Sequence, residues 1–393
     1  MKEQTKLVWF IILLVAASQL ALTIYLPSMP EMVSVFKTDS QHIQLSITVY
    51  LLGYGISQFF YGPLSDIYGR KKIILYGLSI FVIASLVCSL AWTVNFFLIG
   101  RILQGVGIGC GDTMGRAILC DRFEGQKFVK AASHIGVAAT ITPMLGPLLG
   151  GYIEEYSNWR LSFLSIFLYG LIALATVFFY LPETRADDHQ FATTLGGIFK
   201  TYLTILKNRT FICFFLPGAA SFLGEMAYNM QSSFLLQNRI GWGPIGFGWL
   251  NILIIMGLII GTFIANTLAH RMSYIKMVSA GMCLLSFGSI FMFFPALFHF
   301  INTFTIIAPM LVFMAGVGIT YPNTNTGALM PFSKRASGTA GALQGGLQML
   351  FGGLMGIFLS GISIKTQLPL ALTLTVLSLA SHMGFVILLP DRK

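Results

Sequence analysis

The sequence predicts an all-α integral membrane protein with twelve transmembrane helices in two pseudo-symmetric six-helix halves. Three observations lead to this class. Of the 393 residues, 55% are hydrophobic and only 10% are charged, and the mean hydropathy is +0.79, far from the balance of a soluble domain. Apolar runs of roughly 20 residues, the length that crosses a bilayer as a helix, recur along the whole chain. One long polar connection separates six such runs from six others.

The twelve predicted spans follow one another with short connections. The first apolar run, Leu7 to about Leu26, follows Lys2 and Lys6 as a signal peptide would. It is longer than a signal core, lacks a small-residue cleavage site and precedes further spans, so we expect it to remain as the first span. The approximate centres of the spans are Val15, Gly55, Leu86, Cys110, Ile141, Tyr169, Ser221, Met256, Leu285, Met314, Met349 and Leu379.

The net charge of +10 is distributed unevenly between the two sides of the predicted bundle. With the N-terminus placed inside, 18 Lys and Arg residues fall in cytoplasmic segments, and only Lys37, Arg160, Arg239 and Lys365 fall on the other side. This positive-inside asymmetry predicts a bacterial inner-membrane protein with both termini in the cytoplasm. The basic charge therefore orients the chain, and we do not expect nucleic acid as a partner.

The chain divides into residues 1–181, a cytoplasmic central loop at 182–209, and residues 210–393. The halves share weak internal similarity, since "GVGIG" at 105–109 in span four is echoed by "GVGIT" at 316–320 in span ten. The turn after span two also has a degraded counterpart after span eight, "LAHRMS" at 268–273. Such repetition is typical of secondary transporters, whose substrate site lies near the bilayer midplane between the repeats.

The clearest local motif is "GPLSDIYGRKK" at 62–72, between spans two and three. Gly62 and Gly69 permit a tight turn, while Asp66 and Arg70 can form charge-assisted hydrogen bonds. From composition alone, a loop that carries orienting charge is an equal alternative. The pattern resembles the motif of the major facilitator superfamily at this loop and departs from it at Ile67, where Arg is usual.

This resemblance implies the major facilitator fold and a latch that closes the cytoplasmic side. Asp66 would then lie near the N-terminus of span eleven, at 337–339, where the helix dipole favours an anion. Arg70 would meet Asp121 at the end of span four.

Span five carries Gly136 and then "PMLGPLLGG" at 143–151, which contains Gly146, Pro147 and Gly150. Glycines at this spacing flatten one helix face for close packing, and Pro147 bends the helix. Packing alone would explain the pattern. It also resembles the motif of antiport-type members of the superfamily, which implies export.

Further stretches resemble the Bcr/CflA group of drug:proton antiporters within this superfamily, and the resemblance covers essentially the whole chain. It implies proton-coupled efflux but leaves the substrate open, because the group includes exporters of antibiotics and of endogenous metabolites. The stretches are "YLPSMP" at 25–30, "RILQGVGIGCGDTMGRAILCDRF" at 101–123, "WR" at 159–160, "LPET" at 181–184 and "SGTAGALQGGLQMLFGGL" at 337–354.

Two of the 14 acidic residues lie deep in predicted spans, Asp112 in span four and Glu225 in span seven. A charge at the bilayer centre costs roughly 2.5 to 3.5 kcal/mol on insertion scales, so such residues are functional candidates. The superfamily resemblance places spans one, four, seven and ten around the central cavity. We therefore predict that both acids take part in proton coupling.

The surroundings of the two acids differ in sequence. Asp112 and Arg116 are one helical turn apart, which predicts an ion pair that keeps the carboxylate charged. Arg101, about three turns earlier, shares their face. A purely structural tether is the alternative for the pair. Glu225 has no basic residue within one turn, so burial would keep it neutral much of the time, as proton loading and release require. It could instead reach the cytoplasmic interface.

The chain departs from the Bcr/CflA pattern in span one. Members of the group usually carry an acid there, in a pattern like "DMYLP", whereas Thr23 occupies that place here. Glu31, two turns later, is a possible replacement. Together with Arg101 and Arg116, we expect Thr23, Tyr25 and Tyr228 to line the substrate cavity.

These observations predict a secondary transporter that exports a small organic compound by proton antiport and alternating access. A dedicated exporter of one endogenous metabolite, such as a siderophore, is the nearest alternative. A membrane enzyme or a sensor fits less well, because the sequence shows neither a nucleophile with its base nor a signalling domain. It also lacks a GxxxxGK[ST] loop. We expect no cofactor and no metal, and a monomer whose partners are the small-molecule substrate, protons and membrane lipid.

Overall fold

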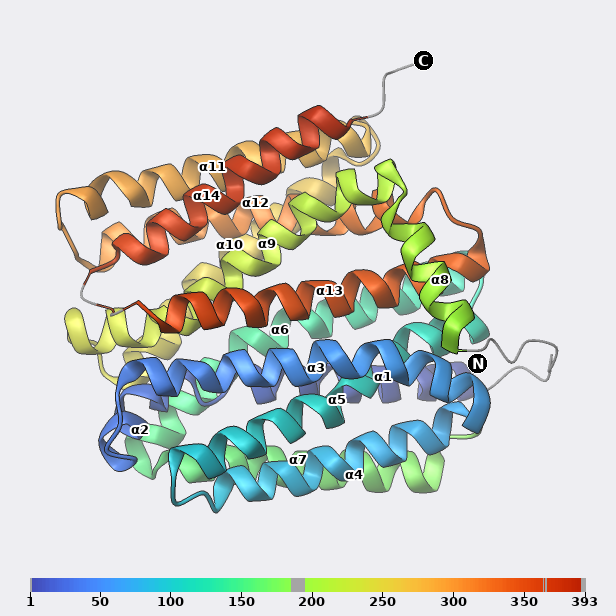
Figure 1. Ribbon diagram of the computed structural model, residues 1–393, viewed down its shortest axis with the longest axis horizontal. Coiled ribbons are helices and arrows are strands. Elements are labelled where there is room, and N and C mark those ends of the chain that lie inside the picture. Colours follow the sequence, from blue (N-terminus) through green and yellow to red (C-terminus); the bar gives the residue numbers. More distant parts are fainter. Residues whose placement is uncertain (1, 185–194, 363, 365, 390–393) are drawn as a thin grey trace.

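The computed structural model describes residues 2–184, 195–362, 364 and 366–389. Within these ranges every regular element is helical, and twelve helices are long and apolar enough to cross a membrane. They lie side by side along one long axis (Figure 1), which confirms the predicted fold class. Part of the predicted central loop lies outside the described residues, as do Arg185, Lys365, Arg392 and Lys393 of the charge count.

The first half of the chain supplies six of the twelve spans. The first of them continues beyond α1 through a short 3-10 turn, η1, into α2. The elements are α1 (Lys2–Thr23), η1 (Leu26–Ser28), α2 (Met29–Val35), α3 (Ser40–Tyr68), α4 (Arg70–Ser89), α5 (Val94–Arg122), α6 (Gly125–Tyr156) and α7 (Trp159–Tyr180).

The second half supplies the other six spans, and the first of these ends in a π-helical segment, η2. The elements are α9 (Arg209–Ser233), η2 (Phe234–Arg239), α10 (Pro244–Leu268), α11 (Tyr274–Leu297), α12 (Thr303–Leu329), α13 (Lys334–Ser360) and α14 (Leu368–Leu388). The exact division at 182–209 remains a prediction.

Polar N-cap side chains set the starts of several helices by accepting a hydrogen bond from a free backbone N–H in the first turn. Asp39 accepts from the N–H of His42 at 2.8 Å at the start of α3. Asn302 accepts from the N–H of Thr305 at 2.9 Å at the start of α12, and Thr305 returns the bond in a capping box. Thr93, Asn158, Asn208 and Ser273 cap α5, α7, α9 and α11 in the same way.

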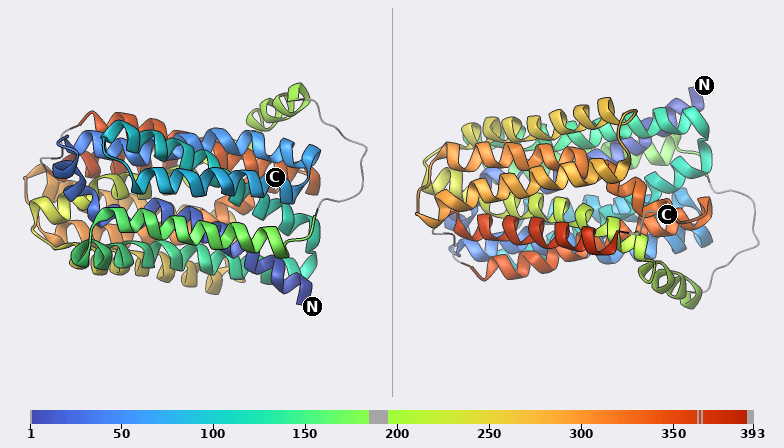
Figure 2. Two further views of the ribbon diagram at one scale, coloured as in Figure 1. Left: turned by 90° about the horizontal axis from the view of Figure 1, so that it is seen from below. Right: turned by 90° about the horizontal axis from the view of Figure 1, so that it is seen from above.

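The segment predicted as a polar central loop contains a helix, α8 (Leu195–Leu206). Tyr202 and Ile205, three residues apart on one helical face, are buried in a cluster with Phe211 and Phe214 of α9. The ring of Tyr202 also meets that of Phe59 of α3 edge to face at 5.7 Å. Figure 2 shows α8 outside the main bundle, near its end. The amphipathic face of α8 therefore packs part of the predicted central loop against the helix bundle.

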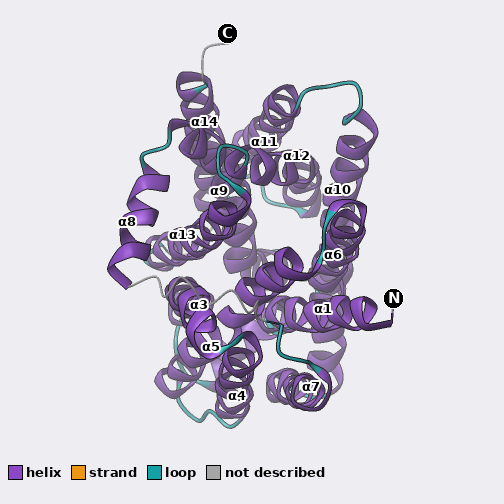
Figure 3. Ribbon diagram, turned by 90° about the vertical axis from the view of Figure 1, so that its right-hand side faces the viewer, coloured by secondary structure: helices purple, strands orange, loops and turns teal. Residues whose placement is uncertain are grey.

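The two halves meet along two seams, where α3 packs along α13 and α6 packs along α10 (Figure 3). Glycines line both. A Cβ atom added to Gly55 would lie 2.9 Å from the carbonyl oxygen of Gly346, and one added to Gly248 would lie 2.7 Å from the Cα atom of Leu148. The helix backbones therefore approach each other with no side chain between them at these points.

The start of α1 and the end of α14 lie at one end of the bundle (Figures 1 and 2), which we call the termini end. The opposite end holds α2 and η2. There Gln237 of η2 donates a hydrogen bond from Nε2 to the carbonyl oxygen of Pro27 in η1, at 2.8 Å. This bond joins the two halves at the opposite end. That the termini end faces the cytoplasm remains the prediction drawn from charge.

Candidate functional site

A small cavity lies where α1 and α6 of the first half meet α9, α10 and α12 of the second. Its volume is about 10 Å³, close to the smallest space that holds one water molecule. Three residues singled out from the sequence, Thr23, Glu225 and Tyr228, share its wall. The full lining is Thr23, Pro143, Pro147, Glu225, Tyr228, Asn229, Asn251, Ile254, Ile255 and Met314.

Glu225, on α9, is half-buried against this cavity. Within the described part of the chain its carboxylate forms no ion pair and accepts no hydrogen bond from another protein group. The carboxylate therefore lies among five helices without a protein partner, as the absence of nearby basic residues predicts.

Two polar neighbours of Glu225, Thr23 and Asn251, each donate a hydrogen bond to a carbonyl oxygen of their own helix. Thr23 donates its hydroxyl proton to the carbonyl oxygen of Gln19 at 2.8 Å. Asn251 donates one proton of Nδ2 to the carbonyl oxygen of Phe247 at 2.9 Å, which leaves Oδ1 and the second N–H of its amide available. Both side chains have thus used a donor on their own helix. The Glu225 carboxylate, Oδ1 of Asn251 and the Thr23 hydroxyl oxygen therefore remain as acceptors on the wall, beside the amide of Asn229 and the hydroxyl of Tyr228, which can also donate.

The predicted ion pair between Asp112 and Arg116 is not formed. Asp112 accepts a hydrogen bond from the hydroxyl of Tyr54 on α3, with 2.6 Å between the oxygens. Arg116 reaches across to the second half and donates from Nη1 to the carbonyl oxygen of Gly341 on α13 at 2.7 Å. Spacing along α5 allows the pair, but partners on neighbouring helices hold the two side chains apart.

Arg101 is fully buried inside the first half. Its guanidinium donates to the carbonyl oxygens of Ala21 at 2.9 Å and Ser46 at 3.3 Å, and to the side chain of Gln104. It also lies over the ring of Tyr50, 4.4 Å from its centroid, where the face of the ring attracts a cation. The structure thus corrects its predicted place on the cavity wall, because filled hydrogen bonds hold it in the core.

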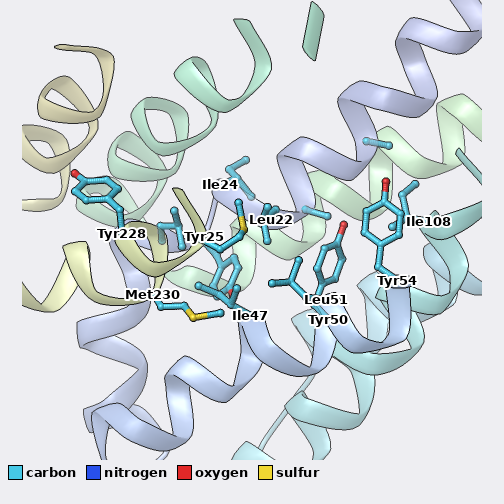
Figure 4. Packing of buried hydrophobic residues seen from close by; sticks show 14 of the residues in the cluster. Leu22, Ile24, Tyr25, Ile47, Tyr50, Leu51, Tyr54, Ile108, Tyr228 and Met230 are labelled. Atoms are coloured by element: carbon cyan, nitrogen blue, oxygen red, sulfur yellow. The ribbon is translucent and has the colours of Figure 1, made fainter. Parts of the chain in front are cut away.

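Tyr25 belongs to the same buried group and is likewise absent from the cavity lining. Its hydroxyl bonds to that of Ser46 at 2.8 Å and accepts from Arg101 at 3.3 Å. Figure 4 shows Tyr25, Tyr50 and Tyr54 following one another, with Tyr228 set apart from them. Of the two tyrosines predicted to line a cavity, only Tyr228 does so here. Its buried hydroxyl has no hydrogen bond of good geometry within the described residues.

The loop motif at 62–72 forms a charged cluster at the termini end. Arg70 pairs with Asp66 at 2.9 Å and with Asp121 at 3.4 Å, which confirms the expected meeting of Arg70 and Asp121. Gly69 has φ = +96°, a conformation that suits glycine, and Gly62 packs at ordinary distance on Thr113. The predicted approach of Asp66 to the start of span eleven stays a prediction, since the side chains at 334–337 are not described.

A residue that sequence reasoning did not assign, Glu183, completes this cluster. Its carboxylate accepts hydrogen bonds from the backbone N–H groups of Arg70, at 2.9 Å, and Lys71, at 3.3 Å. These are free donors at the start of α4, where an anion is favoured. The only sequence feature that could have indicated this role is the position of Glu183, directly after the last span of the first half. The partner helix lies more than 100 residues earlier, so the sequence alone did not reveal the contact.

The glycines of α6 divide between packed and open positions. A Cβ atom on Gly150 would clash with the backbone of Ile24, and one on Gly146 would clash with Thr23, so both glycines let α6 lie close against the end of α1. Pro147 lines the cavity. Gly136 is different, because a Cβ atom there would meet nothing within 4 Å. The packing predicted for Gly136 is therefore absent in this structure.

The cavity also holds two amides, Asn229 and Asn251, that the sequence analysis missed. Asn229 lies one turn after Glu225 on the same helix, and a polar residue in a span is itself a functional signal. Asn251 lies on α10, so only the fold brings it to Glu225. Among the described residues, no group of three or more His, Cys, Asp and Glu side chains comes together in a way that could hold a metal ion.

Comparisons with known proteins agree on one family. The sequence profile described as Major Facilitator Superfamily matches residues 11–357. The chain is 32% identical to multidrug resistance protein D of Escherichia coli (strain K12), over 96% of this chain and 95% of that protein. It is 25% identical to a bicyclomycin resistance protein homolog of Haemophilus influenzae, over 99% and 98% of the two chains.

The same fold occurs in a solved structure of the xylose transporter XylE from E. coli, in a partially occluded inward-open conformation. The TM-score is 0.78 at 12% identity, over 99% of this chain and 98% of that one. At this identity the similarity concerns the fold alone.

Proposed function

Because the chain belongs to the Major Facilitator Superfamily, we propose that it is a secondary active transporter that exports a small organic compound in exchange for protons. The substrate would be a drug, an antibiotic or a similar amphiphile, and the membrane a bacterial inner membrane with both termini in the cytoplasm. The protein would act as a monomer. Relatives named for multidrug and bicyclomycin resistance support drug efflux and give no support to a dedicated exporter of an endogenous metabolite.

The observation that carries the proposal is the unpartnered carboxylate of Glu225 at the junction of the two halves. A carboxylate held in a salt bridge stays charged, whereas one without a partner in a poorly solvated cavity can gain and lose a proton. Helices from both halves form its surroundings. A change of charge at Glu225 therefore acts on the contact between the halves, which is the contact that alternating access must alter.

Arg116 supplies a second element of the proposed cycle. Its bond to the carbonyl oxygen of Gly341 links α5 to α13 across the halves. If the halves rock apart at this level the bond breaks, and Asp112 is then the nearest acid along α5 that could receive the guanidinium. Exchange of Arg116 between Gly341 and Asp112 would thus accompany the movement. In this role Asp112 responds to conformation, while Glu225 carries the proton.

The driving force is sufficient for efflux. One elementary charge that crosses a membrane at 100 mV changes in free energy by about 2.3 kcal/mol. This corresponds to a substrate concentration ratio of about fifty at equilibrium for each net elementary charge that one exchange cycle moves across the membrane.

The test uses inverted inner-membrane vesicles from a strain that overproduces the protein. Respiration acidifies the vesicle interior, and a pH-sensitive acridine dye reports the gradient. Bicyclomycin, ethidium and dansylcadaverine are added separately as probes. If any of them is exchanged for protons, it dissipates part of the gradient in these vesicles and not in vesicles from a deletion strain.

Metabolite profiling of the medium covers substrates outside this panel. Deletion and overproducing strains are compared, and a compound whose export follows the expression level is then tested in the vesicles. Export that persists at full rate after the proton gradient is collapsed by an uncoupler would exclude proton antiport.

A further inference from the structure

The charge of the transported group was left open by the sequence, since two arginines favour an anion and two acids favour a cation. The structure separates these four residues. The hydrogen bonds of Arg101 are filled in the core, and Arg116 donates to Gly341. Asp112 accepts from Tyr54. Among the described residues, Glu225 is the one member of the four whose charged group has no protein partner.

We propose that the Glu225 cavity binds a primary ammonium group, so that the substrates of this transporter are organic amines that carry –NH3+. This inference rests on the proposed transport function and names the class of its substrate. The ammonium group would occupy the cavity and the organic body of the substrate would extend from it.

The hydrogen-bonding character of the wall matches this group. An ammonium has three donors and no acceptor. Glu225 offers a carboxylate, Asn251 offers Oδ1, and Thr23 offers the lone pairs of a hydroxyl whose own proton is already donated. Each of these acceptors would gain a bond from N–H that no protein group provides, and a charge-assisted bond to the carboxylate is the strongest of them.

One backbone oxygen adds to the acceptors on this wall. Pro147 has no N–H, so the carbonyl oxygen of Pro143, four residues earlier, lacks its usual donor within α6. Both prolines line the cavity. The carbonyl of Pro143 is therefore a further acceptor at the level of Glu225, supplied by the first half of the chain.

The size of the cavity restricts the class further. A volume of about 10 Å³ is that of about one water molecule, and –NH3+ has nearly the size of water. A trimethylammonium group is much larger and has no N–H to donate, and a delocalised aromatic cation is larger still. The cavity therefore distinguishes primary amines from the quaternary cations that carry the same charge.

The charges around the cavity are consistent with a single positive group. In the lining only Glu225 and Tyr228 are titratable, since α1, α6, α10 and α12 contribute Thr23, prolines, Asn251 and apolar side chains. Tyr321 of α12 lies within electrostatic range of Glu225, Asp112 and Arg116. One ammonium neutralises Glu225 and leaves no net charge in the cavity, which low dielectric favours.

A binding assay with purified protein in lipid nanodiscs tests the inference without any transport step. The probe is dansylcadaverine, a fluorescent compound with one primary ammonium, and its trimethylammonium and N-acetyl derivatives share the same body. Fluorescence anisotropy gives Kd for each at a fixed, near-neutral pH. We expect the primary amine to bind at least about tenfold more tightly than either derivative, since each lacks charge-assisted N–H donors for Glu225.

Variants assign the preference to the cavity. Glu225→Gln should remove it, so that the three compounds bind equally. Thr23→Val keeps the shape but removes the acceptor and should weaken the primary amine alone, whereas Thr23→Ser keeps the hydroxyl and should bind as the wild type does. Glu155→Gln, which changes an exposed acid farther along α6, is the control for nonspecific charge. Gel filtration of each variant checks that it is folded.

The outcomes separate this inference from the proposed function. Equal affinity for all three compounds in the wild type, or an ammonium preference that survives Glu225→Gln, would overturn the inference. In that case proton-driven efflux of a neutral probe such as bicyclomycin would leave the transport function intact. Conversely, an ammonium preference that follows Glu225 and Thr23 supports the inference, even if the inverted vesicles show no proton exchange and the antiport proposal fails.

Discussion

The two halves of the bundle treat charge inside the membrane in opposite ways. The first half contains Arg101, Asp112 and Arg116, and every one of them is bonded to a specific protein group. The second half contains a single acid at comparable depth, Glu225, which faces a cavity and has no protein partner within the described residues. The same fold thus holds its charges firmly on one side of the seam and leaves one charge available on the other.

This difference distinguishes charged residues that stabilise the fold from the one residue that we propose couples transport to protons. A guanidinium that donates to carbonyl oxygens in the core keeps the helices of the first half together, and it has little freedom to change state during transport. An unpartnered carboxylate contributes little to packing but responds to protons and to ligands. We therefore expect substitution of Arg101 to change mainly stability, and substitution of Glu225 to change mainly transport.

Substitution of Arg101 should have the largest effect on stability. Arg101→Leu removes the hydrogen bonds to the carbonyl oxygens of Ala21 and Ser46 and to the side chain of Gln104, and a hydrogen bond from a charged group is worth about 1.5–3 kcal/mol. We expect a loss of about 4 kcal/mol or more in the free energy of unfolding, measured by thermal unfolding in detergent. Arg101→Lys should recover only part of it, because an ammonium lacks the planar fork. An Arg101→Leu protein that is as stable as the wild type would contradict this comparison between the two halves.

Glu225→Gln should abolish coupling with little change in stability. Without a titratable group at this site an imposed pH gradient no longer drives accumulation, so the concentration ratio of the substrate across the membrane should fall to one. Proteoliposomes with an imposed pH gradient measure this. We expect the unfolding midpoint to stay near that of the wild type, since no protein bond is lost. Unchanged proton-coupled transport would remove Glu225 from the mechanism.

Tyr54→Phe tests whether the hydrogen bond from Tyr54 to Asp112 stabilises the fold. The substitution removes the donor to a partly buried carboxylate, so stability should fall by about 2 kcal/mol. In Asp112→Asn protein the same substitution should cost less, and the difference in a double-mutant cycle isolates the Tyr54–Asp112 term. A coupling energy near zero would place Asp112 beside Glu225 as an acid free to change state.

The smallest expected effect concerns the helix caps of the two halves. Asp39→Ala and Asn302→Ala should each cost about 1 kcal/mol. The N–H of His42, which bonds to Asp39, lowers the pKa of that carboxyl below its ordinary value of 3.8. The contribution of the Asp39 carboxylate to stability is therefore complete above the ordinary pKa of 3.8 and is lost as the pH falls through the lowered pKa of the folded protein.

Asn302 does not titrate, so its contribution should not depend on pH. Unfolding of wild type, Asp39→Asn and Asn302→Ala across the acidic range measures the contrast. Equal pH dependence in wild type and Asp39→Asn would show that the cap at Asp39 contributes no acid sensitivity.

The sequence was sufficient for the parts of the structure that depend on local pattern. Hydropathy predicted the twelve spans, and the resemblance of the loop motif to that of the superfamily implied that Arg70 meets Asp121. The isolation of Glu225 was also visible, since no basic residue lies within one turn of it. Two further features were present in the local pattern but were not predicted: the amphipathic face of α8, within a segment expected to be polar, and Asn229, a polar residue within span seven.

The partners of the other buried charges were beyond local reasoning. Asp112 and Arg116 are one turn apart, yet they bond to Tyr54 and Gly341, which lie 58 and 225 residues away in the sequence. Within a membrane the nearest donor or acceptor in space decides such contacts, and spacing along a helix only permits them. Arg101 was assigned to a cavity for the same reason, since its face on α5 was predictable and its enclosure by α1 and α3 was not.

The glycine seams bear on how any mutational scan of this protein should be interpreted. Alanine is normally the small residue that deletes a contact, but at Gly55 or Gly248 it is the large one, because its methyl group would lie within 3 Å of the facing helix backbone. If an alanine variant at one of these positions is inactive, the cause is therefore steric overlap between two helices. The residues that contact the substrate are unchanged in such a variant. On the proposed mechanism, scans of the seams would identify the surfaces along which the halves move, and scans of the cavity lining would identify the residues that select the substrate.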